Sequence, residues 1–202
     1  MTSHRNGSEI FASDGRLSAL WQEIDAALTN IDDHSIITHF NSLPNPKPKS
    51  ISATLNRLIR KELVDFGWLP ESAIFADGDF RQSTWRLDFA KDDVGVEVGF
   101  NHGEAVAWNL IKPVLAGELN HVRKAVQARV GIVIAATDDM KEAGGFDGAV
   151  GSYERYVQYL KPLQQLLTVP LVVIGLEPPQ SFRISHETVN GRKVGSVQLG
   201  RF

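Results

Sequence analysis

Cysteine is absent from the 202 residues of this chain. Its absence excludes disulfides, thiolate metal sites and a cysteine nucleophile, and it fits a reducing compartment. Long apolar runs are also missing, since none approaches the roughly 20 residues that a helix needs to span a bilayer. The polar opening stretch, MTSHRNGSEIFASDG, lacks the apolar core of a signal peptide. These absences predict a cytoplasmic protein with no membrane partner.

An excess of positive charge is missing as well. Lys and Arg number 21 against 24 Asp and Glu, which gives a formal net charge of −3. No overall basic field therefore indicates nucleic acid, although a local basic face can coexist with an acidic active site. Hydrophobic residues make up 43% and charged residues 22% of the chain, as in ordinary globular proteins.

Hydrophobic periodicity divides the chain into helices and strands. Helical spacing predicts helices at 14–29, 33–42, 51–66, 104–128 and 152–167. Alternation or short apolar runs predict strands at 72–76, 84–91, 94–100, 130–137 and 169–177. The C-terminal stretch reads as a hairpin turning at Asn190-Gly191, a strong type I′ turn signal.

The order of these elements predicts an α/β fold in a single domain, 1–202. The strand–helix–strand unit of 130–177 predicts a parallel pair joined by a right-handed crossover. The hairpin before it adds antiparallel strands, so we expect a mixed β-sheet flanked by helices on both sides. The prolines of PNPKPK (44–49) cannot continue a helix. They separate an N-terminal helical appendage, 1–45, from a core at 50–202.

The stretch RLDFAKDDVGVEVGF (86–100) places one acid in each arm of the central hairpin, Asp88 and Glu97. Side chains alternate between the faces of a strand. A two-residue turn at Asp92-Asp93 pairs position 88 directly with position 97 and points both carboxylates to the same face. A three-residue loop without a bulge would separate them, so the prediction depends on the register.

Two carboxylates this close repel each other and need compensation by a shared proton or a divalent cation. Mg²⁺ suits carboxylates, carbonyls and waters, and usually leaves room for a substrate phosphate. Glu62 interrupts the apolar stripe of the preceding helix and is a candidate third acid at the same place. The alternative is that Asp88 and Glu97 are solvated residues on the open face of an amphipathic hairpin.

An Asp followed by Glu-x-x on the next strand, then a helix and a buried strand, resembles the core of the PD-(D/E)XK nucleases. More narrowly, WRLDFAKDDVGVEVGFNHGEAVAWNLIKPVLA looks like the BglII/BstYI branch of type II restriction endonucleases, as do LIRKELVDFGW upstream and VGIVIAATDDM downstream. The resemblance covers about 55–180 and implies a restriction-endonuclease-like core.

The resemblance also implies roles for individual residues. Asp88 would be the bridging metal ligand and Glu97 the second ligand, with the main-chain carbonyl of Val98 completing the Mg²⁺ shell. The metal would activate a water and stabilise charge on the scissile phosphate. The position two after the Glu is usually Lys, Glu or Gln in such enzymes, but here it is Gly99, so another group must substitute. His102 and Glu62 are the candidates.

The family's DNA contacts follow this motif and the next strand. They point to Asn101 and His102, and to the stretch Thr137–Lys141 with Thr137, Asp138 and Lys141. Asn can read adenine and His can meet guanine acceptors in the major groove. The alternatives are a helix N-cap region for Asn101-His102 and a capped loop start for Thr137.

Together these patterns predict a Mg²⁺-dependent type II restriction endonuclease that cuts double-stranded DNA at a short palindrome. A two-fold site implies a homodimer, formed by the helix at 104–128 or by the N-terminal helices. Gly99 motivates the rival reading, a weak or inactive DNA-binding protein of the same fold. A small-molecule metallohydrolase is the third.

Overall fold

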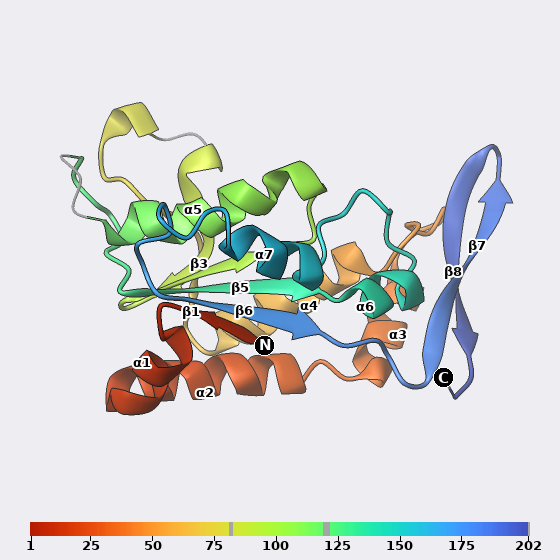
Figure 1. The fold of residues 1–202 in the computed structure, drawn as a ribbon. Coiled ribbons are helices and arrows are strands. Elements are labelled where there is room, and N and C mark those ends of the chain that lie inside the picture. The colour runs from red at the N-terminus through yellow and green to blue at the C-terminus, as the bar shows by residue number, and fades with distance from the viewer. Residues whose placement is uncertain (81–82, 119–121, 202) are drawn as a thin grey trace.

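The computed structural model describes residues 1–80, 83–118 and 122–201 (Figure 1). The helices are α1 (Gly7–Ser13), α2 (Gly15–Thr29), α3 (Asp33–Ser42), α4 (Ser52–Asp65), α5 (Val106–Gly117), α6 (Asp138–Ala143) and α7 (Tyr153–Leu160). The strands are β1 (Thr2–His4), β2 (Leu69–Ala73), β3 (Arg86–Lys91), β4 (Val94–Val98), β5 (Val130–Ala136), β6 (Leu171–Leu176), β7 (Phe182–Val189) and β8 (Arg192–Leu199). Short 3₁₀ helices lie at Gly78–Phe80, Ser83–Trp85 and Gly103–Ala105.

A mixed six-stranded sheet in the order β1-β6-β5-β4-β3-β2 forms the centre of the molecule. The β4–β5 and β5–β6 pairs are parallel, and the pairs toward both edges are antiparallel. The chain leaves β5 through α6 and α7 and returns as β6, as the strand–helix–strand pattern predicts. The α/β class with a mixed sheet is therefore confirmed.

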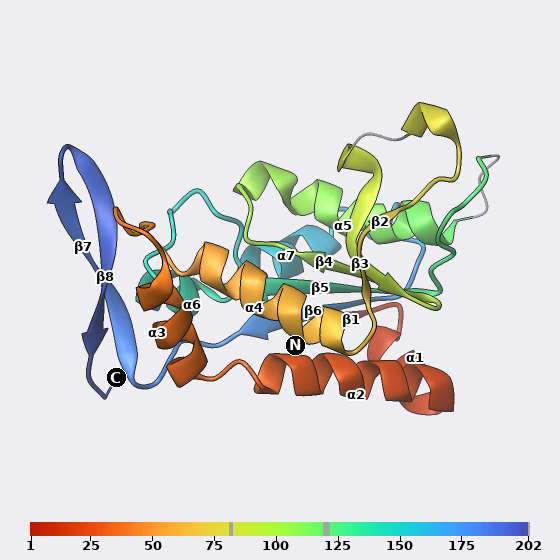
Figure 2. The same ribbon diagram turned by 180° about the vertical axis from the view of Figure 1, so that it is seen from behind.

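Helices cover the sheet on both faces, with α5 and α7 on one and α2 and α4 on the other (Figures 1 and 2). Alternation along the hairpin decides which side chains meet which layer. Phe89, Val96 and Val98 pack into the cluster that includes the apolar stripes of α2 and α4. Between the sheet and α5 and α7 lies a second cluster, built on Val133, Leu171, Val173, Val106, Leu110 and Tyr156. The intervening hairpin residues, Glu97 and Gly99 among them, thus face α5 and α7.

The N-terminus contributes a strand that the sequence did not predict. β1 pairs antiparallel with β6 at the edge of the sheet, and α1 packs on α2 directly after it. Gly7 lies so close to β6 that an added Cβ would stand 2.9 Å from the carbonyl carbon of Leu171. The helical appendage expected at 1–45 thus includes a strand of the central sheet.

The long helix predicted at 104–128 is wrong in its second half. α5 ends at Gly117, and the described residues from 122 onward are not helical; residues 119–121 lie outside the described residues. A Cβ at Gly117 would meet the Ala128 carbonyl oxygen at 2.7 Å, so the chain turns where a side chain would obstruct its return. The helix predicted at 152–167 is likewise shorter, because α7 ends at Leu160.

The last two strands form a separate hairpin that stands away from the central sheet at one end of the molecule (Figure 1). Asn190 and Gly191 both have positive φ, 50° and 75°, as a type I′ turn requires. The predicted turn is therefore confirmed. Among the described residues, no helix has the length and apolar character needed to cross a bilayer.

Candidate active site

The central hairpin has the register that brings the two acids together. Phe89 pairs with Val96 and Lys91 with Val94, which leaves Asp92 and Asp93 as a two-residue turn. Asp92 takes a left-handed φ of 49° there, which Asp tolerates better than most residues. Continuing the ladder by one step sets position 88 opposite position 97, as predicted from the sequence.

Asp88 is half-buried and oriented by the backbone of the neighbouring strand. Its Oδ2 accepts a hydrogen bond from the Val98 N–H at 2.7 Å. Burial raises the pKa of the Asp88 carboxyl, against the lowering effects of that hydrogen bond and of the Lys112 ammonium. A buried carboxyl of raised pKa costs free energy when it ionises unless a cation joins it.

Glu97 is the more deeply buried of the two acids, with 1% of its surface exposed. Its Oε1 has no hydrogen-bond partner among the described residues, and its Oε2 meets only the Lys112 ammonium. Burial, followed by the charge of Asp88, raises the pKa of Glu97 well above its usual range, and Lys112 offsets only part of this rise. Buried polar oxygens without partners are rare in proteins and are a signature of a binding or catalytic site.

Lys112 is the cation that the protein itself places beside these acids. It lies on α5, is 8% exposed, and forms an ion pair with Glu97 Oε2. Its Nζ also donates to the main-chain oxygen of Arg86 at 3.2 Å. The sequence reasoning missed Lys112, because only the packing of α5 on the hairpin brings it to Glu97.

Two more buried polar residues complete the surroundings. Asn109 (2% exposed) and Tyr156 (1% exposed) come from α5 and α7, and the Asn109 Nδ2 donates to the Tyr156 hydroxyl at 2.7 Å. Burial raises the pKa of Tyr156, helped by the nearby charges of Glu97 and Asp88, so the hydroxyl keeps its proton. No sequence motif indicated either residue.

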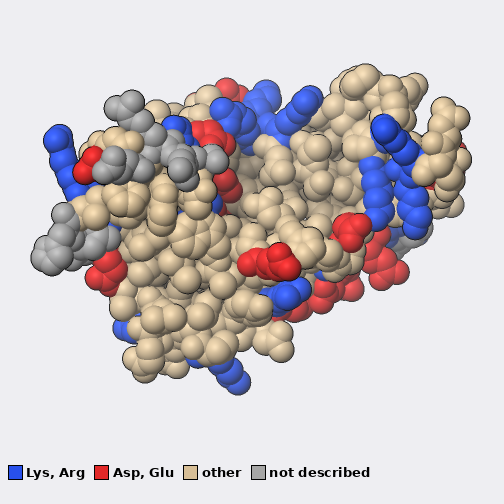
Figure 3. Space-filling model, turned by 90° about the horizontal axis from the view of Figure 1, so that it is seen from above, with Lys and Arg blue, Asp and Glu red and all other residues tan. Residues whose placement is uncertain are grey.

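A hollow of about 270 Å³ borders the site at Asp88 and Val98. Its other lining residues are Asn56, Arg57, Arg60, Glu71, Phe89 and Asn101. Arg57 and Arg60 are exposed on α4, so positive charge lines one side of the hollow and the acid the other. Figure 3 shows groups of basic and of acidic side chains on one face and no continuous basic surface there, in agreement with the net charge of the chain.

The donors at the site fit a hard divalent cation. Asp88 and Glu97 offer carboxylate oxygens and the hollow also reaches Val98, the set from which Mg²⁺ is usually bound together with waters. The unpartnered Oε1 of Glu97 is where such an ion would supply the missing partner. Among the described residues, no group of three or more His, Cys, Asp or Glu could hold a metal, so only the pair and backbone oxygen remain as protein ligands.

Glu62 does not join the pair. Its carboxylate accepts hydrogen bonds from Asn30 at 3.0 Å and from Lys61 at 2.8 Å, and these hydrogen bonds lower its pKa. α4 packs on the face of the sheet opposite to the one that Glu97 faces. The buried stripe of α4 is Leu55, Ile59 and Leu63, so the helical phase turns position 62 away from the core.

Asn101 and His102 are exposed just beyond the end of β4. His102 precedes the 3₁₀ helix Gly103–Ala105 but makes no capping hydrogen bond through its side chain, so capping does not account for it. Its Nδ1 lies 4.0 Å from Glu104 Oε2. Asn101 lines the hollow together with Asp88, whereas His102 follows it in the chain and is open to solvent without lining the hollow.

Thr137, Asp138 and Lys141 lie at the start of α6. Thr137 is the N-cap: its hydroxyl accepts from the Met140 N–H at 3.1 Å and donates to the Leu176 oxygen at 3.0 Å. This side chain is therefore engaged as a cap, which is the alternative that the sequence left open. Asp138 is exposed, and Lys141 lies 3.7 Å from it with little of its side chain accessible.

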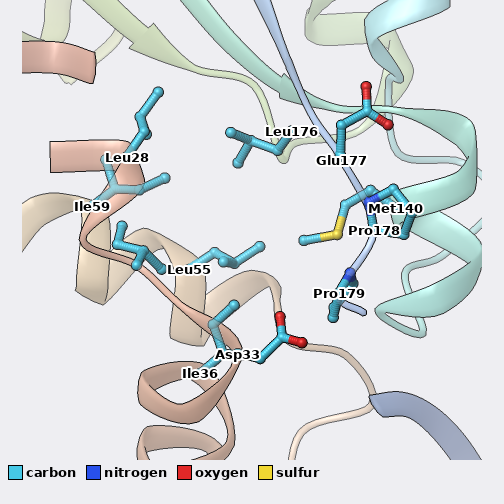
Figure 4. A pocket seen from close by; sticks show the side chains of 11 residues that line it. Leu28, Asp33, Ile36, Leu55, Ile59, Met140, Leu176, Glu177, Pro178 and Pro179 are labelled. Carbon is cyan, nitrogen blue, oxygen red and sulfur yellow. The ribbon is translucent and has the colours of Figure 1, made fainter. Parts of the chain in front are cut away.

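A second hollow, of about 190 Å³, lies between α2, α3, α4 and the end of β6 (Figure 4). Its walls are mainly apolar, including Leu28, Ile59 and Met140, with the carboxylates of Asp33 and Glu177 at its edge. Asp33 is already engaged by Ser181, whose hydroxyl donates to it at 2.7 Å. This hollow shares no lining residue with the one at Asp88.

Comparison with known proteins agrees with this architecture. A mixed sheet flanked by helices, with two acids side by side on its central hairpin, is the arrangement found here, and the comparisons place it in the restriction endonuclease class. The chain belongs to the restriction endonuclease BglII/BglIII family, whose model matches residues 1–176. It is by that membership a type II site-specific deoxyribonuclease.

Two solved structures share the fold. The crystal structure of restriction endonuclease BglII complexed with a DNA 16-mer is 21% identical, with a TM-score of 0.66 over 97% of this chain and 85% of that one. The structure of free BglII is 20% identical, with a TM-score of 0.56 over 98% of this chain and 97% of that one. A search of curated proteins found no match. The family match ends at the last residue of β6, so the β7–β8 hairpin lies beyond it.

Proposed function

We propose that this chain hydrolyses phosphodiester bonds of double-stranded DNA at a short palindromic site, with Mg²⁺ as cofactor. The observation that carries the proposal is the buried Glu97 carboxylate beside the half-buried Asp88. Its Oε1 lacks a hydrogen-bond partner among the described residues, and its Oε2 meets only Lys112. A pair of acids kept in this state costs stability and is explained by a cation that binds there.

The residues divide the work as follows. Asp88, Glu97 and the Val98 carbonyl would hold Mg²⁺, and the Val98 N–H fixes the orientation of Asp88. When bound, the metal supplies a water of lowered pKa and positive charge beside the scissile phosphate. The Asp88–Glu97 charge then has a partner, and Lys112 keeps a further positive charge within reach of the site.

DNA would enter at the hollow. Arg57 and Arg60 are exposed beside Asp88 and offer charge-assisted hydrogen bonds to phosphates. Asn101 lines the same hollow and His102 follows it in the chain, and both have exposed side chains suited to base edges. Asp138, exposed at the start of α6, stays a weaker candidate for a DNA contact, while Thr137 and Lys141 have little accessible side chain.

The test is a cleavage assay on DNA of varied sequence with Mg²⁺, comparing the protein with Asp88→Asn and Glu97→Gln. We expect discrete fragments from the unmodified protein and a fall in cleavage rate of at least a thousandfold in both variants, because each substitution removes a metal ligand and its charge. Asp92→Asn is the matched control, an exposed acid in the turn of the same hairpin, and it should cut normally.

The same assay, run with a binding measurement in Ca²⁺, separates the rival functions. Gly99 favours an inactive DNA-binding protein as the second candidate, which would bind one sequence tightly without cutting it. A protein that neither binds nor cuts DNA would contradict both readings and leave a small-molecule metallohydrolase.

A further inference from the structure

Gly99 leaves the third position of the acidic motif without a side chain, but another residue fills the space. A Cβ built on Gly99 would stand 2.7 Å from Cζ of Tyr156 and closer still to its hydroxyl oxygen. Real Cβ atoms essentially never approach other atoms that closely. The tyrosine hydroxyl therefore lies where a side chain at position 99 would begin, and glycine is the residue that lets it lie there.

The hydroxyl is held in place from two helices. α7 begins at the Ser152 cap, whose hydroxyl accepts from the Arg155 N–H at 3.4 Å, and it buries Tyr156 against the sheet. Asn109 on α5 donates to the hydroxyl oxygen at 2.7 Å. Because this bond uses a lone pair of the oxygen, the hydroxyl proton stays available for an acceptor.

The hydroxyl lies on the side of the sheet that carries the acidic pair. Positions 97 and 99 share one face of β4, so the hydroxyl stands on the face that carries Glu97. The charges of Glu97 and Asp88 both act on it. A buried tyrosine packed only for its ring would not require a glycine opposite its polar end, and phenylalanine would fill the same apolar cluster without the need for Asn109.

We propose that the Tyr156 hydroxyl, oriented by Asn109, takes the place of the side chain missing at Gly99 and positions the attacking water by a hydrogen bond. This inference rests on the proposed nuclease function. In the reaction, the water oxygen bonds to phosphorus as the bond from phosphorus to the leaving oxygen breaks. The water gives its proton to solvent and the leaving oxygen gains one from solvent, while Tyr156 begins and ends protonated.

The first arm of the test is Tyr156→Phe, which removes only the hydroxyl. We expect the single-turnover cleavage rate at saturating Mg²⁺ to fall on the order of a hundredfold. DNA affinity in Ca²⁺ should stay near that of the unmodified protein, and the thermal midpoint should fall by several degrees, because the buried Asn109 amide loses its acceptor. Tyr159→Phe, half-buried on the same helix with its ring beside Arg155, is the matched control and should cut at the normal rate.

The second arm is a rescue. Tyr156→Ala alone should cut as poorly as Tyr156→Phe, whereas Gly99→Gln combined with Tyr156→Ala should recover at least tenfold, because the vacated space then admits a motif side chain. This comparison also decides the matter if Tyr156→Phe folds poorly.

The outcomes separate the two proposals. If the unmodified protein cuts and Tyr156→Phe cuts equally fast, the inference about Tyr156 is overturned and the nuclease stands. The inference is also overturned if the loss of cutting follows the loss of folded protein and the double variant shows no recovery. If the unmodified protein does not cut DNA at all, the nuclease proposal fails and takes this inference with it.

Discussion

At the scale of single residues, the unusual feature is that two acids are placed where ionisation is unfavourable. Burial raises the pKa of Asp88, and burial together with the Asp88 charge raises that of Glu97. Exposed acids elsewhere in the chain do the opposite: hydrogen bonds lower the pKa of Asp14, Asp32 and Asp147. Ionisation of Asp88 and Glu97 therefore destabilises the folded protein, whereas ionisation of the acids with lowered pKa stabilises it. The two sets of acids change the free energy of unfolding in opposite directions as the pH rises.

The raised pKa of Asp88 predicts how stability changes with pH. Between the ordinary value of 3.8 and the raised value, the folded protein holds a proton that the unfolded chain has lost. The contribution of Asp88 to the free energy of unfolding is therefore fully present below its ordinary pKa. That contribution is lost as the pH rises through its raised pKa in the folded protein. Asp88→Asn lacks this loss, keeps an oxygen that can accept from the Val98 N–H, and relieves Glu97 of a neighbouring charge.

We therefore expect Asp88→Asn to gain stability relative to the unmodified protein as the pH rises above the ordinary carboxyl value of 3.8. Denaturant unfolding at a series of pH values in EDTA measures the difference directly. Asp92→Asn, in the exposed turn, should show a difference that stays flat. A difference for Asp88→Asn that is flat, or that shrinks with rising pH, would contradict the raised pKa.

At the scale of elements, the sequence predicts the structure best where a short local pattern also determines which residues pair. The alternation around Asp92-Asp93 specified the strands, the turn and the register together. It therefore also specified that Asp88 and Glu97 lie opposite each other on one face. The helices predicted at 14–29 and 33–42 from their apolar spacing are confirmed, and in the structure Asp14 and Asp32 cap them. Patterns of a few residues failed: β1 and α1 are too short to show a period and owe their structure to β6.

The misplacement of Glu62 and the omission of Tyr156 have related causes. Glu62 was assigned to the wrong side of α4, since the stripe that the sheet buries passes through Leu63. Asn109, Lys112 and Tyr156 reach the site only because α5 and α7 pack on the same face of the sheet. No local sequence pattern predicts that α5 and α7 pack together at the site. The one indication in the sequence is Gly99, a glycine where the motif usually has a functional side chain.

The exposed face of α4 predicts a role in binding DNA phosphates. Arg57 and Arg60 line the hollow at Asp88, and each phosphate contact releases counterions from DNA. Replacing each with alanine should weaken DNA binding in Ca²⁺ for cognate and unrelated sequences alike. It should also reduce the slope of log affinity against log salt by about 1 per residue. Lys61→Ala is the control on the same helix, because Lys61 pairs with Glu62 and Asp65 instead; an equal effect there would argue against a specific contact.

At the scale of the whole molecule, the described part of the chain contains one pair of acids facing α5 and α7, and one hollow bordered by it. One such site can break one strand at a time. A palindrome presents the same sequence to two chains related by a two-fold axis. We therefore expect a concerted double-strand break to use two copies of this chain, each acting on its own strand.

Subunit mixing tests this requirement. A dimer that combines one unmodified chain with one Glu97→Gln chain should bind the site normally and cut a single strand, because only one of its two sites holds the metal. On supercoiled plasmid with one site, differently tagged chains co-expressed and purified as mixed dimers should give nicked circles in place of linear DNA. Dimers of two unmodified chains should give linear DNA, and dimers of two variant chains neither product. Linear DNA from the mixed dimer at the full rate would mean that one chain cuts both strands, and the proposed two-fold arrangement would then be wrong.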